Sequence, residues 1–288
     1  MPVVDLPAAT ISYRVSGPDP AANGAAGPPV VFVHGFLVDS TLWDGVAELL
    51  AAAGVRSFLP DWPLGAHVLP TDGAGDLSPR GVARLVVSFL EALDLHDVTL
   101  VGNDTGGAVC QLVLDTDASR IGRVVLTNCD AFENFPPKAF VPLFVAARHP
   151  GLTRVLMQPM RWRVLRHSPL GYGLLLRRPR DAARTRRWVR PAMTDGRIRR
   201  DIARFCRGVD RRELVDVASR LHEFTGPVRI VWGTRDRCFT LATARRLVEV
   251  FPDAELIEVP DVSTFVSVDR PDAVADAIVA LHHRHAPA

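Results

Sequence analysis

Short continuous runs of apolar residues recur along the chain, and a helical pattern follows most of them. The run VVFVH begins at Val30, and similar runs begin at Val98, Arg123, Val228 and Ala254. Apolar runs of this length without polar alternation are typical of parallel strands that are buried on both faces. They predict the central strands of a sheet, and the alternation of residues 3–15 predicts one or two further strands.

Helical spacing appears between these runs. Leu42, Val46, Leu49 and Leu50 fall on one face of a predicted helix, with Ser40 as the expected N-cap. The segment Ser78–Leu95 begins with a serine cap and a proline at the first helical position, which is a strong helix start. Alternation of strands and helices predicts an α/β fold, a mostly parallel sheet with helices on both faces.

The alternation stops between about residues 136 and 220, where proline-interrupted helices replace it. We interpret residues 136–220 as a helical cap that is inserted into a core domain of residues 1–135 and 221–288. Between Arg148 and Arg212 there are 19 arginines and only four acidic residues, while the rest of the chain has a net negative charge. The arginine-rich cap either attracts an anionic substrate or partner, or is a solvated face that balances the acidic core.

Composition indicates an ordinary globular protein, with 48% hydrophobic and 23% charged residues. We expect no membrane segment, because no apolar run approaches the ~20 residues of a spanning helix. The N-terminus has no signal-peptide pattern, and the four cysteines are scattered, so we expect reduced thiols, a cytoplasmic location, no metal and no cofactor.

The most informative motif is the turn from Gly102 to Gly106, which lies between a predicted strand and a predicted helix. It has the pattern of a nucleophile elbow, with Asp104 at the place of the commoner serine. Asp104 would stand above the strand at the helix N-terminus, where the helix dipole favours a carboxylate. We interpret Asp104 as a catalytic residue, the other interpretation being a plain N-cap, and Asn103 as a neighbour of the site.

A second turn, His34-Gly35-Phe36, follows the first buried strand. The backbone N–H of Phe36, together with that of Thr105, would form an oxyanion hole. We interpret His34 as a residue that stabilises the turn.

With these motifs the chain resembles the α/β-hydrolase superfamily over nearly its whole length. The resemblance rests on VFVHGF, the elbow VGNDTGG, VWGTRD and the terminal DRPDAVADAI helix. An Asp nucleophile is similar to the haloalkane dehalogenase and epoxide hydrolase branch, whose aspartate attacks carbon to form an alkyl ester. The resemblance implies that Asp236 is the catalytic acid, with Asp130 as the alternative acid position.

Three departures from this branch stand out. Thr264 occupies the place where the resemblance implies the histidine base, and threonine accepts no proton near neutral pH. Thr105 replaces the usual halide-binding tryptophan after the nucleophile. Epoxide hydrolases use two cap tyrosines, and this chain has at most one counterpart, Tyr172.

A histidine elsewhere in the chain is a candidate for the missing base, and cap residues are candidates for the substrate pocket. His67 follows the second buried strand, at the sheet edge where α/β proteins bind ligands, so His67 is the candidate for a relocated base, the other interpretation being a polar loop residue. Trp162 and Tyr172 in the cap either line an apolar pocket above Asp104 or belong to the ordinary core of the cap, which helical spacing favours for most of the large cap side chains.

Three hypotheses about function follow from these residues. The first is a hydrolase of a small organic molecule that uses Asp104 and an atypical or relocated base. The second is an isomerase, cyclase or lyase in which Asp104 is a general acid/base, and the third is an inactive protein that binds a small ligand. No nucleic-acid or membrane partner is expected, and a homodimer through the cap is left open.

Overall fold

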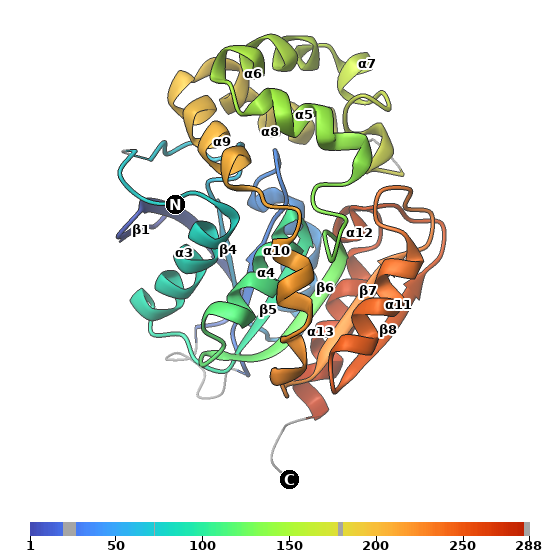
Figure 1. Cartoon of the computed structure of the whole chain (residues 1–288). Coiled ribbons are helices and arrows are strands. Elements are labelled where there is room, and N and C mark those ends of the chain that lie inside the picture. The colour runs from blue at the N-terminus through green and yellow to red at the C-terminus, as the bar shows by residue number, and fades with distance from the viewer. Residues whose placement is uncertain (20–26, 72, 178–180, 285–288) are drawn as a thin grey trace.

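Eight strands form one sheet within the part of the chain that the computed structural model describes, residues 1–19, 27–71, 73–177 and 181–284 (Figure 1). The strand order is β1-β2-β4-β3-β5-β6-β7-β8. Strand β2 pairs antiparallel with β1 and β4, and the pairs from β4 to β8 are parallel. The strands are β1 (Val3–Leu6), β2 (Ala9–Ser16), β3 (Val30–Val33), β4 (Ser57–Pro60), β5 (Val98–Asp104), β6 (Ile121–Cys129), β7 (Val228–Gly233) and β8 (Ala254–Val259).

The predicted mostly parallel sheet is thus confirmed, and burial explains its sequence pattern. Every residue of β3, β4, β5 and β7 is buried, as continuous apolar runs require. Strand β8 lies at the edge of the sheet and mixes exposed with buried positions.

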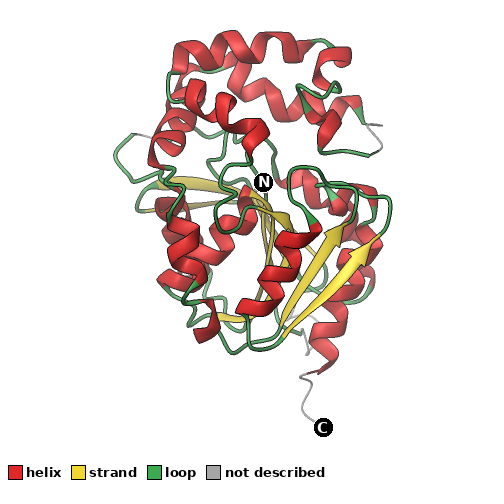
Figure 2. Cartoon of the chain, turned by 45° about the vertical axis from the view of Figure 1, so that its right-hand side comes forward, coloured by secondary structure: helices red, strands yellow, loops and turns green. Residues whose placement is uncertain are grey.

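Helices cover both faces of this sheet (Figure 2). The helices α2 and α13 pack against each other, and α3 and α4 form another packed pair. Ser78 caps α3 as predicted, but Asp39, and not Ser40, is the N-cap of η1 before α2. The core helices are η1 (Ser40–Trp43), α2 (Asp44–Ala52), α3 (Pro79–Ala92), α4 (Thr105–Thr116), α10 (Glu213–Ala218), η5 (Leu221–Glu223), α11 (Leu241–Val250), α12 (Val266–Asp269) and α13 (Pro271–Arg284).

Between β6 and β7 the chain leaves the sheet and forms a layer of helices above the carboxyl ends of the strands (Figure 1). We call this layer the cap; it comprises η2 (Lys138–Phe140), α5 (Val141–Ala147), α6 (Pro150–Met157), η3 (Gln158–Arg161), α7 (Arg163–Arg166), η4 (Tyr172–Leu174), α8 (Ala182–Thr194) and α9 (Gly196–Gly208). Helix α10 packs on α4 in the core, so the helical layer ends before the predicted limit at residue 220.

A short cap segment, Tyr172–Leu175, is hydrogen-bonded to two loops of the core. The Tyr172 hydroxyl donates to the carbonyl oxygen of Leu37 at 2.5 Å. The Ser263 hydroxyl donates to the carbonyl of Leu174 at 2.7 Å, and the Phe265 N–H donates to that of Leu175 at 3.0 Å. The cap therefore contacts both the loop after β3 and the loop after β8.

Candidate active site

Asp104 is the last residue of β5 and the N-cap of α4, and it holds a left-handed backbone with φ of +55°. Such a conformation costs a non-glycine residue about 1–3 kcal/mol and persists only where the surroundings enforce it. The surroundings do so here, because a Cβ on Gly106 would lie 2.2 Å from the carbonyl oxygen of Val33. The strained turn presents the Asp104 side chain at the carboxyl edge of the sheet.

Backbone amides of the two predicted oxyanion-hole residues hydrogen-bond to the Asp104 carboxyl. The Phe36 N–H donates to Oδ2 at 3.0 Å, and the Thr105 N–H also bonds to this carboxyl. A Cβ on Gly35 would lie only 2.2 Å from Oδ2, so glycine is required for this approach. Oδ2 of Asp104 itself thus occupies the position predicted for the oxyanion of a substrate.

The same surroundings change the acidity of Asp104. Burial raises its pKa to about 7, while the Thr105 and Phe36 amides oppose this shift and the nearby Asp236 adds to it. Close to neutral pH, the protonated and the ionised form of Asp104 are therefore both populated.

Asp236, in the loop after β7, is a buried carboxylate with four donors. Its Oδ1 accepts from the backbone N–H groups of Cys238 at 2.7 Å and Phe239 at 3.0 Å. Its Oδ2 accepts from Asn128 Nδ2 at 2.9 Å and from the Thr264 hydroxyl at 2.8 Å. Burial raises the pKa of Asp236, and these hydrogen bonds oppose the shift.

Thr264 is fully buried, and its hydroxyl donates to Oδ2 of Asp236. The Asn103 side chain fixes the loop of Thr264, since its Nδ2 donates to the carbonyl oxygen of Thr264 at 2.8 Å. Asn103 also donates to the Thr127 hydroxyl, so it supports the loop and does not contact the Asp104 carboxyl in any described hydrogen bond.

Asp130, the alternative acid position, lies immediately beside the elbow. Its N–H donates to the carbonyl oxygen of Asp104 at 3.3 Å, and its Oδ2 accepts from the Thr105 hydroxyl at 3.2 Å. Among the described residues none hydrogen-bonds to its buried Oδ1. Burial raises the pKa of Asp130 well above its usual range, and the charge of Asp104 raises it further. The sequence signal for this residue was its place directly after a buried strand.

The two ring nitrogens of His67 contact groups other than Asp104. Its Nδ1 accepts from the Gly65 N–H at 3.2 Å, so its Nε2 carries the proton and lies 3.3 Å from Oδ2 of Asp201 in α9. Both ring nitrogens are therefore engaged in joining a core loop to the cap. The expectation that His67 is a relocated base finds no supporting contact with Asp104.

The remaining predicted residues divide between the site and the surface. His34 is fully buried, accepts from the Trp62 N–H at 2.9 Å, and holds its turn as expected. Tyr172 is buried above the Phe36 loop, but its hydroxyl is already bonded to Leu37. Trp162 was predicted to line the pocket; it is instead 51% exposed, with the Arg161 guanidinium 4.1 Å from its ring centre.

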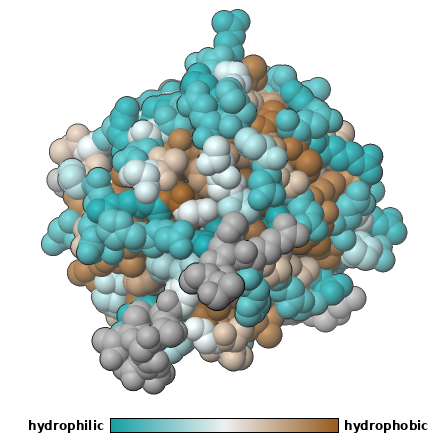
Figure 3. All heavy atoms as spheres, turned by 90° about the horizontal axis from the view of Figure 1, so that it is seen from below, coloured by the Kyte–Doolittle hydropathy of each residue, from teal (hydrophilic) through white to brown (hydrophobic). Residues whose placement is uncertain are grey.

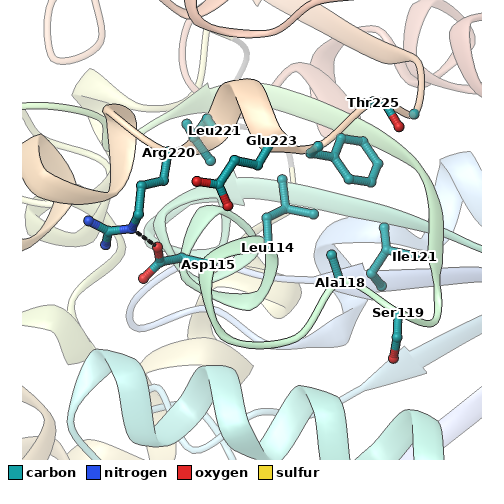
Figure 4. A pocket seen from close by; sticks show the side chains of 11 residues that line it. Leu114, Asp115, Ala118, Ser119, Ile121, Arg220, Leu221, Glu223 and Thr225 are labelled. Carbon is teal, nitrogen blue, oxygen red and sulfur yellow. Dashed lines mark hydrogen bonds and ion pairs between the residues drawn. The ribbon is translucent and has the colours of Figure 1, made fainter.

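A cavity of about 590 Å³, shown in Figure 4, lies beside the start of β6, whereas Asp104 lies at the opposite end of the parallel strands. The cavity is bounded by Ile121 at the start of β6, by the end of α4 and by η5. Figure 4 shows Arg220 paired with Asp115 at its edge, and Asp115 also binds Arg80. Glu223, Ser119 and Thr225 also line this cavity, but no residue predicted for the site does, so Asp104 remains the candidate centre. Within the described ranges no cluster of His, Cys, Asp or Glu side chains has the arrangement of a metal site.

Comparisons with known proteins agree with the fold. Residues 30–277 match the model of the alpha/beta hydrolase family. The chain is 26% identical to haloalkane dehalogenase 2 of Mycobacterium bovis, over 88% of this chain and 87% of that protein. It is also 26% identical to a 2-hydroxy-6-oxononadienedioate/2-hydroxy-6-oxononatrienedioate hydrolase of Cupriavidus pinatubonensis, over 81% and 79% of the two chains.

Among solved structures, an ancestral haloalkane dehalogenase superposes with a TM-score of 0.78 and covers 99% of both chains. Its sequence identity to this chain is 17%, so this likeness concerns the fold.

Proposed function

Because the chain belongs to the alpha/beta hydrolase family, we propose that it is a hydrolase-like enzyme in which Asp104 attacks an electrophilic carbon of a small organic molecule. Alkyl halides and epoxides are the substrate classes that fit an aspartate nucleophile. The proposal rests on the hydrogen bond from the Phe36 N–H to Oδ2 of Asp104.

This hydrogen bond suits carbon attack better than it suits attack on a substrate carbonyl. A serine hydrolase leaves its oxyanion hole open for the carbonyl oxygen of the substrate. Here Oδ2 of Asp104 fills that position, which leaves Oδ1 to form the bond to carbon. With an alkyl halide the carbon–halogen bond breaks and halide ion departs; with an epoxide a ring C–O bond breaks and the alkoxide, which stays on the product, takes a proton from water. The product is an alkyl ester of Asp104, whose carbonyl oxygen Oδ2 already lies against the Phe36 amide.

Hydrolysis of this ester requires a water molecule whose proton is accepted by a base. Thr264 accepts none, and its hydroxyl is committed to Asp236. The raised pKa of Asp130 favours its protonated form, which donates a proton and does not accept one. We therefore propose that the ester forms readily and is hydrolysed slowly.

One observation supports a second candidate function. A pKa of about 7 is close to the optimum for a general acid/base that works near neutral pH. In that case Asp104 would move a proton in an isomerisation, cyclisation or elimination, and no ester would form. An inactive binding protein is less well supported, because a strained elbow has little value without chemistry.

The direct test is the intact mass of the protein after incubation with a panel of primary alkyl halides and epoxides. We expect one added alkyl group for each chain. Its rate of formation should rise with pH and level off above pH ~8, since only the ionised form of a group with a pKa of about 7 is nucleophilic. Product without any adduct, formed more slowly as pH rises, would favour the general acid role.

Substitution of His67 by alanine separates a structural role from a catalytic one. We expect the free energy of unfolding to fall by about 1–3 kcal/mol, because Asp201 and the Gly65 N–H each lose a buried partner. The rate of adduct formation at a temperature where the variant is folded should stay within about threefold of wild type. Loss of turnover in a fully folded variant would restore His67 as the base.

A further inference from the structure

The outer side of the cap is unusually apolar for a protein surface. Fourteen large hydrophobic side chains are exposed among the described residues, and eight of them lie between Val145 and Leu170. The most exposed are Val155 at 66%, Val164 at 81% and Leu170 at 84%. They belong to α6, α7 and the turn after α7, which lie at the outer edge of the cap in Figure 1. Apolar side chains gathered in this way usually mark an interaction site.

The same segment carries positive charge without any negative charge. From Asn134 to Arg180 the sequence contains nine Lys or Arg and no Asp or Glu. Arg148, Arg154, Arg161 and Arg163 are all exposed between the apolar side chains. We call this set of exposed residues from Val145 to Leu170 the cationic cap surface.

Elsewhere in the described part of the chain this combination is absent. The other six exposed hydrophobic side chains lie apart along the chain, from Met1 and Val3 to Val215. Figure 3 shows the end of the molecule opposite the cap, where hydrophobic residues alternate with hydrophilic ones. The apolar and cationic residues are therefore a local feature of the cap.

We propose that the cationic cap surface docks on the surface of a lipid bilayer that contains anionic lipids. Helical segments with exposed apolar residues, a tryptophan and arginines bind at the boundary between lipid headgroups and acyl chains. Arginines lie beside anionic headgroups, each contributing on the order of 1 kcal/mol near the surface. Trp162 with Arg161 over its ring has the amphipathic character of a side chain at this boundary.

Charge distinguishes this partner from a second copy of the chain. A symmetric dimer through the cationic cap surface would place arginines of one copy against those of the other, with no acidic residue in the segment to pair with them. The cap dimer that the sequence left open is thus disfavoured on this face. No membrane partner was expected because the sequence has no spanning segment. Among the described helices none is long and apolar enough to cross a bilayer, and docking on the bilayer surface requires none.

Vesicle sedimentation of the full chain tests the proposal. Vesicles of phosphatidylcholine with one third phosphatidylglycerol should bind the protein at low ionic strength, and pure phosphatidylcholine vesicles should bind it at least about tenfold more weakly. Val155→Glu should weaken binding to the anionic vesicles about tenfold. Val215→Glu, a change of the same type on exposed α10, should alter binding less than twofold.

Three results would overturn the proposal, provided that both variants melt like wild type. The first is absence of binding to the anionic vesicles. The second is an equal loss of vesicle binding in the two variants, and the third is a dimer in solution that Val155→Glu dissociates. Equal binding to both kinds of vesicle would also contradict it, since the arginines would then contribute nothing.

Discussion

Substitution of Asp104 by asparagine is expected to abolish the covalent adduct and, at pH 8, to raise the free energy of unfolding by about 2–4 kcal/mol. The adduct is lost because an amide oxygen is a poor nucleophile toward carbon. Stability rises because asparagine has nearly the shape of aspartate but places no charge in the buried elbow.

The gain in the free energy of unfolding depends on pH because the pKa of Asp104 is higher in the folded than in the unfolded state. The pKa of Asp104 is raised from 3.8 to about 7, so between these values the folded state binds more protons than the unfolded state. Wild-type stability therefore falls as pH rises from about 4 to about 7, and it changes little from this cause above that range. The asparagine variant lacks this dependence, so the two curves should converge near pH 4.

Urea unfolding of both proteins at pH 4.5 and pH 8 measures the effect, with intact mass recorded in parallel. An alkyl adduct on the asparagine variant would show that another residue is the nucleophile. A stability difference of the same size at both pH values would show that the Asp104 carboxyl is not destabilised by its burial.

Substitution of Thr264 by histidine is expected to speed decay of the alkyl ester by ~10²–10⁴-fold. The Thr264 hydroxyl lies 2.8 Å from Oδ2 of Asp236, so a ring N–H at this position can bond to the same carboxylate. The other ring nitrogen is then free to accept a proton from water. Asp236, with its three other donors, is already arranged to orient such a ring.

Decay of the adduct mass after removal of excess substrate gives the rate. Thr264→Asn is the matched control, because asparagine also bonds to Asp236 but accepts no proton. Thr264 is fully buried, so thermal unfolding must first show that both variants fold. Equal decay rates in the two variants would indicate that no ester forms on Asp104, or that its hydrolysis needs no base.

Local features of the sequence predicted the framework of the site. The strands β3, β5 and β7 are continuous apolar runs because both of their faces are buried, and the pattern from Gly102 to Gly106 indicates a strained turn because a strand precedes it and a helix follows it. The amides of Phe36 and Thr105 could be related to Asp104 from the sequence, because their position follows from the backbone of these turns.

Contacts between segments that are far apart in the sequence could not be predicted from such local features. The partner of His67 is Asp201, which lies 134 residues away on a cap helix. The spacing around Trp162 is equally compatible with an inner and an outer face of the cap, and only the packing of α7 decides between them. Asp39 caps η1 in place of Ser40 because its carboxylate also binds Arg187 and Trp188 of the cap.

The hydrogen bonds of Tyr172–Leu175 have a consequence for protein engineering. Leu37, which accepts from Tyr172, directly follows the residue whose amide holds Asp104, and Leu174 and Leu175 bind residues on either side of Thr264. The cap is therefore not an exchangeable module. A chimera that combined this core with the cap of a relative would keep both loops of the candidate site in place only if the grafted cap supplied a hydroxyl and two carbonyl groups at the same three points.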